Sequence, residues 1–97
     1  MRKKHKIDML AFERVIGVFA SITTQEDMRK FMNELLTAGE MRDLTLRWLL
    51  LERLVKGETQ RKIAEDLQIS LCKITRGSKI LKQKDSVTAR VLKSERL

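Results

Sequence analysis

Apolar side chains recur along the chain at spacings of three and four residues, the spacing that places them on one face of a helix. The clearest such face comprises five residues at positions i, i+3, i+4, i+7 and i+8: Met28, Phe31, Met32, Leu35 and Leu36. A similar stripe predicts an earlier helix over residues 7–20. Thr23 or Thr24 is expected to cap the second helix, because acidic residues follow in its first turn.

The longest predicted helix lies in the middle of the chain. Its start is marked by the capping box Thr37-Ala38-Gly39-Glu40, and its end near Lys56 by Gly57 as a left-handed cap. The helix is apolar on nearly every side, and a helix of that kind has to be surrounded. We therefore expect a homodimer in which both chains wrap this helix. A monomeric bundle with a central helix is the alternative.

Three shorter helices are predicted after Gly57. Thr59 or Gln60 begins the first, Ser70 caps the second, and Asp85 or Ser86 caps the last. With no proline and four glycines, the chain favours helices joined by short connections. The predicted fold class is all-α, with about six helices in a single domain over residues 1–97.

Residues 59–82 have the pattern of a helix-turn-helix. Ala64 is the small residue where the two helices cross, and apolar residues fill the usual core positions: Ile63, Leu67, Ile69 and Ile74. Gln68 stands in the turn at a position where the backbone takes a positive φ, which glycine usually occupies. We therefore expect some backbone strain at Gln68.

The distribution of charge favours nucleic acid as the partner of this motif. The net charge is +8 and the isoelectric point near 10.1. Residues 69–84 contain five basic side chains and no acidic one. Side chains at the start of the second helix of such a motif enter the major groove, while basic ones around it contact phosphate. The predicted DNA contacts are Gln60, Arg61, Ser70, Leu71, Cys72, Lys73, Thr75, Lys79 and Lys82.

Several classes of protein are disfavoured. With Cys72 as the only cysteine, an internal disulfide is excluded and a reducing cytoplasm is expected; Cys72 and His5 cannot build a zinc site. A signal peptide or membrane span is not expected, since Asp8, Glu13 and Arg14 break the apolar stretch after the basic start. An enzyme is not expected either, because the chain lacks a glycine-rich phosphate loop and a plausible nucleophile–base pair.

The run Ile74-Thr75-Arg76-Gly77-Ser78, followed by Leu81-Lys82, resembles the signature of the trp operon repressor family. The resemblance covers residues 35–82 and includes these upstream positions: Leu36-Thr37, Glu40, Leu44, Arg47, Gly57-Glu58, Gln60-Arg61 and Leu67. It implies an intertwined, all-helical homodimer that represses tryptophan biosynthesis or transport genes. L-tryptophan would be the corepressor, and the dimer would bind double-stranded operator DNA.

The resemblance also implies a tryptophan pocket between the central helix and the recognition helix. Arg47 and Arg76 would sandwich the indole, Leu51 would line its edge, and Gly77 would let the ligand approach the backbone. The ammonium group would be held by carbonyls of the other subunit, at the end of its second helix: Glu34, Leu36 and Thr37. Lys73 would also stand near the ligand.

Three departures from the family pattern leave other interpretations open. Lys73 replaces a small hydroxyl residue, Ile80 stands where a serine helps near the ammonium, and the loop between Glu58 and Gln60 is one residue shorter. The ligand could then be another indole-type compound, or the protein a ligand-independent helix-turn-helix regulator. Alternatively, the chain is a small basic RNA-binding or scaffold protein, against which stands the lack of an aromatic stacking surface.

Overall fold

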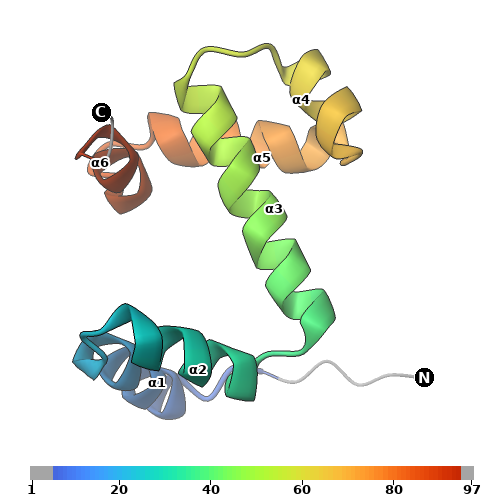
Figure 1. Cartoon of the computed structure of the whole chain (residues 1–97). Coiled ribbons are helices and arrows are strands. Elements are labelled where there is room, and N and C mark those ends of the chain that lie inside the picture. Colours follow the sequence, from blue (N-terminus) through green and yellow to red (C-terminus); the bar gives the residue numbers. More distant parts are fainter. Residues whose placement is uncertain (1–5, 95–97) are drawn as a thin grey trace. The chain divides into compact units, whose positions relative to one another are not determined.

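The structure is a computed structural model that describes residues 6–94. Within that range the chain forms six helices and no strand, which confirms the all-α prediction. The helices are α1 (Met9–Ser21), α2 (Gln25–Leu35), α3 (Ala38–Val55), α4 (Gln60–Leu67), α5 (Leu71–Lys82) and α6 (Val87–Ser94) (Figure 1). His5 and most of the basic start of the chain lie outside the described residues.

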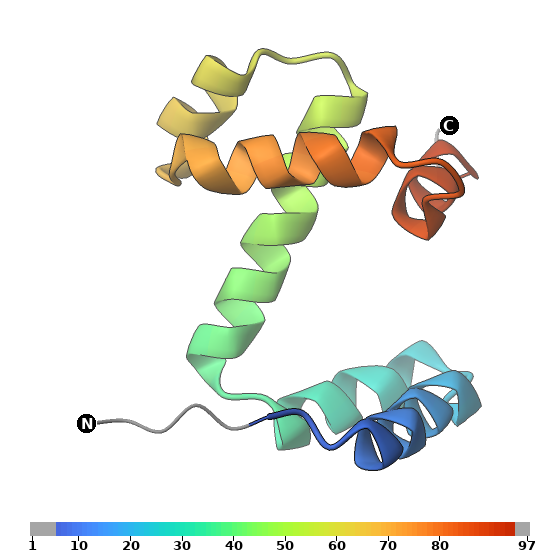
Figure 2. The ribbon, with the colours of Figure 1, turned by 180° about the vertical axis from the view of Figure 1, so that it is seen from behind.

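The chain divides into two units, the first up to Ala38 and the second from Gly39. In the first unit α1 and α2 lie side by side, and the rings of Phe19 and Phe31 meet edge to face with centroids 5.2 Å apart (Figures 1 and 2). The carboxylate of Asp8 accepts a hydrogen bond from the backbone N–H of Ala11, so α1 starts two residues later than predicted. The hydroxyl of Thr24 caps α2 in the same way, as one of the two predicted caps.

No residue of α1 or α2 is buried. The apolar side chains that remain exposed around these helices are Ile7, Met9, Leu10, Phe12, Val15, Ile16, Val18 and Leu35. Leu10 is 77% exposed and Ile7 is 69% exposed. The hairpin of α1 and α2 therefore does not bury its own apolar surface.

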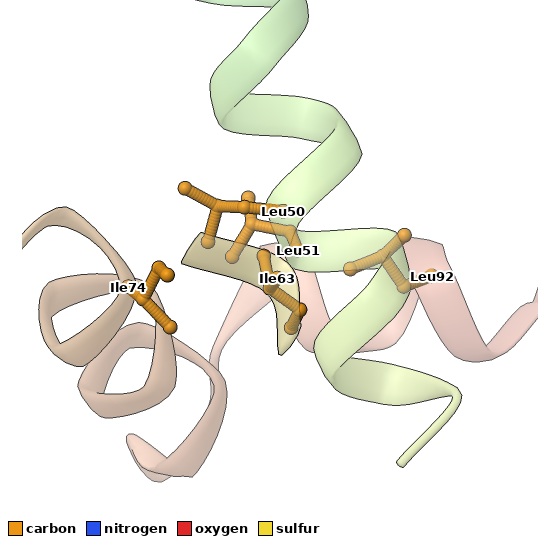
Figure 3. Close-up of a cluster of buried hydrophobic side chains, with 5 residues drawn as sticks. All are labelled: Leu50, Leu51, Ile63, Ile74 and Leu92. Atoms are coloured by element: carbon orange, nitrogen blue, oxygen red, sulfur yellow. The ribbon is translucent and has the colours of Figure 1, made fainter. Parts of the chain in front are cut away.

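The second unit has a hydrophobic core drawn from four helices. Figure 3 shows its five buried side chains: Leu50 and Leu51 from α3, Ile63 from α4, Ile74 from α5 and Leu92 from α6. Half-buried apolar residues, among them Trp48, Leu54 and Leu81, pack against this cluster. The core ties all four helices of the unit together.

The central helix α3 ends as the sequence predicts. Gly57 has φ 88°, its N–H donates to the carbonyl of Leu54, and the N–H of Glu58 donates to the carbonyl of Arg53. These two bonds form a Schellman motif, which satisfies the last carbonyls of the helix. Within the chain α3 is not surrounded, however, because Leu44 and Leu49 remain exposed.

The helix-turn-helix consists of α4, a short turn and α5, at the predicted position. The hydroxyls of Thr59 and Ser70 cap the two helices by accepting hydrogen bonds from the N–H groups of Lys62 and Lys73. Gln68 has φ 53° and ψ 49°, which confirms the predicted left-handed conformation at a residue other than glycine. Leu71, at the first position of α5, is 56% exposed, so it is accessible for the DNA contact that was predicted for it.

An ion-pair cluster around Arg53 fixes the connection between α3 and α4. The Arg53 Nε–H donates to Glu58 at 2.8 Å, and its Nη2 donates to Asp66 at 2.5 Å. These bonds raise the pKa of the Arg53 guanidinium and lower the pKa of both carboxyl groups. A single side chain of α3 thus joins Glu58, in the loop after the helix, to the last turn of α4.

Candidate ligand pocket and nucleic-acid interface

A pocket of about 320 Å³ lies in the second unit. Small-molecule sites commonly have volumes of about 300–1,000 Å³. Most of the lining residues belong to α3 and α5, and one lies in the turn before α5: Asp43, Leu46, Arg47, Leu50, Leu51, Ile69, Lys73, Arg76, Gly77 and Ile80. The pocket thus lies between α3 and α5, the second helix of the helix-turn-helix.

The two walls of the pocket follow from helix periodicity. On α3 the lining residues repeat over two turns from Asp43 to Leu51, and on α5 they repeat from Lys73 to Ile80. Residues at spacings of three, four and seven share one helix face, so each wall is a single face of its helix.

Gly77 allows α5 to pack closely on α3, which it crosses (Figures 1 and 2). A Cβ atom at this position would lie 2.6 Å from Leu50 Cδ1 and 3.3 Å from Leu51 Cδ2. Gly77 is buried and also lines the pocket, as predicted. A glycine at this position was predicted to allow the approach of a ligand; the close contact between the two helices is a further reason for it.

The lining of the pocket combines apolar side chains with an excess of positive charge. Arg47, Lys73 and Arg76 contribute three cations, and Asp43 contributes one carboxylate. Arg47 and Asp43 lie four residues apart on α3, but they do not form an ion pair with each other. The net positive charge favours a ligand with an anionic group, and the guanidinium planes favour an aromatic one.

Five of the predicted ligand residues line this pocket: Arg47, Leu51, Lys73, Arg76 and Gly77. Glu34, Leu36 and Thr37 lie instead at the end of the first unit, and their assignment to the pocket of a second subunit stays a prediction. The sequence reasoning did not assign Asp43, Leu46, Leu50 or Ile69 to the pocket. The position of Asp43 one turn before Arg47 was the signal that could have found it.

The predicted DNA contacts lie on exposed surface of α4 and α5. Leu71, Cys72, Thr75 and Lys79 line a shallow hollow on α5, together with Arg76. Gln60 and Arg61 are exposed at the start of α4, where the backbone N–H groups and the helix dipole attract phosphate. Ser70 and Lys82 are exposed at the two ends of α5. Arg76 is shared by the hollow and the pocket, so one side chain adjoins both candidate sites.

Within residues 6–94, no group of three or more histidine, cysteine, aspartate and glutamate side chains comes together as a metal site. None of the helices in this range has the length and apolar character needed to cross a membrane.

Residues 11–96 match the family described as Trp repressor protein. A Trp operon repressor homolog of Chlamydia trachomatis serovar L2 is 35% identical over 82 residues, covering 79% of this chain and 87% of that relative. Homologs of the same name from Xylella fastidiosa strain M23 and Vibrio campbellii are 35% and 30% identical, and cover 70% and 93% of this chain and 75% and 91% of their own. No solved structure matches the chain.

Proposed function

Because the chain belongs to the Trp repressor protein family, we propose that it is a transcriptional repressor that uses L-tryptophan as its corepressor. Proteins of this family are DNA-binding regulators and not enzymes. In this proposal, tryptophan binds in the pocket between α3 and α5, and operator DNA binds to the exposed face of α5. The regulated genes would be those of tryptophan biosynthesis or transport, and the protein would act in the cytoplasm.

The observation that carries the proposal is the pocket with Arg47 on one wall and Arg76 on the other, above an apolar floor. Guanidinium planes stack on aromatic faces, and tryptophan has the largest aromatic face of the amino acids. The carboxylate of the ligand would then meet the positive charge of Lys73 and Arg76. Leu50, Leu51 and Ile69 would bury the edge of the indole.

The location of the pocket supports a switch mechanism. A ligand between α3 and α5 contacts the back of the recognition helix, whose front carries the predicted DNA contacts. The two recognition helices of a helix-turn-helix dimer must enter successive major grooves, which are about 34–36 Å apart. Tryptophan would favour DNA binding only if it binds more tightly to the arrangement with this spacing. Without the ligand, the recognition helices would favour non-specific binding.

The uncovered apolar residues support a homodimer. Eight large apolar side chains are exposed in the first unit, and Leu44 and Leu49 are exposed on α3. A second copy of the chain would cover these residues and so surround α3. The end of α2 in that copy would supply carbonyls to the pocket, from Glu34, Leu36 and Thr37 of the partner subunit. Sedimentation equilibrium of the purified chain should give twice the chain mass of 11.3 kDa.

The repressor function is tested with double-stranded DNA selected by the protein from a random pool in the presence of L-tryptophan. Fluorescence anisotropy then measures the affinity for the selected duplex with and without the amino acid. We expect palindromic sequences and an affinity that rises at least tenfold with L-tryptophan. Equal binding of single-stranded RNA would instead support an RNA-binding protein.

A ligand-independent regulator is the second candidate, and two residues of the pocket favour it. Lys73 adds a charge and Ile80 an apolar side chain, where the family pattern has hydroxyl groups. In this case the selected duplex would bind with the same affinity whether or not L-tryptophan is present. The DNA-reading role of α5 would be unaffected by that result.

A further inference from the structure

We propose that Asp43 binds the α-ammonium group of the ligand, so that the pocket selects an amino acid over its deaminated analogue. This inference rests on the proposed function, since it assumes that the pocket binds an indole with an amino-acid group. It goes further by adding a carboxylate of the same subunit to the carbonyls that the partner subunit would supply, since an ammonium has three N–H groups to donate. Asp43 would thereby be a residue that determines ligand specificity.

The pocket has few side-chain hydrogen-bond acceptors. An ammonium group has three donors and no acceptor, so it needs oxygen atoms around it. Of the ten side chains that line the pocket, three are cationic donors and six are apolar or glycine. The carboxylate of Asp43 is the only side-chain acceptor in that set.

The carboxylate of Asp43 is available to a ligand, because it takes part in no ion pair with the cations of the pocket. Arg47 lies one turn after Asp43 on α3 and could have formed an ion pair with it. The two side chains do not pair, and Asp43 has no salt bridge to Lys73 or Arg76 either. Asp43 is exposed and lines the pocket. A bound ammonium would therefore gain a carboxylate without first breaking an ion pair.

The carboxylate and two of the three cations lie on different walls of the pocket. Asp43 lies on α3, which also carries Arg47, whereas Lys73 and Arg76 lie one turn apart on α5. An amino acid carries its carboxylate and its ammonium on one carbon atom, and the pocket offers a partner of each sign. A ligand with its carboxylate towards α5 and its ammonium towards α3 would satisfy both groups.

Asp43 also changes the preference among anionic ligands. The four charged side chains of the pocket sum to a net charge of +2. Without the Asp43 charge, three cations would remain, and a simple carboxylate such as indole-3-propionate would be attracted more strongly. The carboxylate of Asp43 thus opposes analogues that lack the ammonium and supports those that carry it.

The test compares two ligands and three proteins by isothermal titration calorimetry. The ligands are L-tryptophan and indole-3-propionate, which differ in the ammonium group. The proteins are the wild type, Asp43→Asn and the control Glu65→Gln, which removes an exposed carboxylate of α4 outside the pocket. Asp43→Asn should weaken L-tryptophan binding about tenfold or more, as expected for a lost charge-assisted hydrogen bond, and should leave or improve indole-3-propionate binding. Glu65→Gln should change neither affinity.

The outcomes separate this inference from the proposed function. If the wild type binds neither ligand, the proposed function is wrong and the role of Asp43 falls with it. If the wild type binds L-tryptophan but Asp43→Asn binds both ligands as the wild type does, only the inference is overturned. An equal loss for both ligands would also overturn it, because the ammonium would then not be what Asp43 contacts.

Discussion

The two units of this chain differ in how much of their apolar surface they bury. In the second unit four helices bury a shared core, and Ile63 and Ile74 are fully inaccessible to solvent. In the first unit two helices bury no residue, and most of their apolar side chains remain exposed. Exposed apolar surface of that extent usually marks a contact with another protein.

The exposed surfaces differ in chemistry as well. The first unit exposes aliphatic and aromatic side chains, whereas α5 in the second unit exposes three lysines and one arginine and has no acidic residue. An apolar surface is suited to a protein partner and a basic surface to phosphate. We infer that the first unit mainly serves assembly and that the second serves ligand and DNA binding.

The largest expected effect comes from the core of the second unit. Ile74→Ala removes a fully buried side chain and should lower the free energy of unfolding by about 2–5 kcal/mol. The matched change in the first unit is Ile16→Ala, at a side chain that is 43% exposed. It should instead weaken dimerisation about tenfold. Urea denaturation measures the first effect and sedimentation equilibrium the second; unchanged dimerisation of the Ile16 variant would show that no partner covers this face.

One glycine in a helix of each unit tests how closely that unit is packed. Gly77→Ala would bring a Cβ atom to 2.6 Å from Leu50 Cδ1, so the leucine has to move, and we expect a net loss of about 1–2 kcal/mol. Gly17→Ala in α1 meets nothing within 4 Å and should gain about 0.5–1 kcal/mol from helix propensity. Chemical denaturation measures both variants. A destabilised Gly17 variant would indicate that a second chain approaches α1 closely at this point.

Two glutamines that follow helices provide the next test. Gln68 has φ 53°, a conformation that costs most residues about 1–2 kcal/mol, so Gln68→Gly should stabilise the protein by about 0.5–1 kcal/mol. Gln83 after α5 has φ −64°, where glycine only adds freedom to the unfolded chain. Gln83→Gly should therefore be destabilising by about 0.5–1 kcal/mol. Equal effects of the two changes in thermal unfolding would contradict the account of the turn.

A smaller effect is expected for one phosphate contact. Lys82→Ala should weaken binding to every DNA sequence and reduce the slope of log affinity against log salt by about 1. Lys56→Ala is the control, because it removes an exposed lysine of the loop between α3 and α4 that is not among the predicted DNA contacts. Anisotropy titrations at several salt concentrations give the slopes. A slope that is unchanged by Lys82→Ala would remove this residue from the interface.

The Arg53 cluster predicts a modest dependence of stability on pH. The pKa values of Glu58 and Asp66 are lowered in the folded protein, mainly by their hydrogen bonds to Arg53. The unfolded chain therefore binds more protons over the range below the ordinary carboxyl pKa of about 4. The contribution is present above that pH and is lost as the pH falls through the lowered values. Between pH 5 and pH 2, the free energy of unfolding of Arg53→Met should therefore fall less steeply than that of the wild type, as measured by denaturation curves at each pH.

Local signals in the sequence predicted most of the helix ends correctly. Thr24, Thr59 and Ser70 cap helices because a hydroxyl satisfies an N–H group within the next three residues, which needs no tertiary context. Gly57 ends α3 and Gln68 turns the chain for equally local reasons. Asp8 was missed as a cap because the apolar stripe was traced back to Ile7.

The features that could not be predicted depend on how helices cross. The contact of Gly77 with Leu50 requires α5 to lie across α3, and no periodicity within one helix specifies that crossing. The same holds for Leu46, Leu50 and Ile69, which become pocket residues only through the crossing. Leu44 and Leu49 of α3 are exposed in the single chain. The sequence predicted that α3 is surrounded, so it predicts that these two residues are covered only in a homodimer.

The proposed corepressor site is the pocket between Arg47 and Arg76, through which tryptophan would control α5. It is tested by calorimetric titration of L-tryptophan into the wild type, Arg76→Ala and Lys82→Ala. We expect one site per chain in the wild type, no detectable binding in Arg76→Ala, and unchanged binding in Lys82→Ala, because Lys82 lies outside the pocket. Undiminished tryptophan binding by Arg76→Ala, or no binding by the wild type, would contradict it.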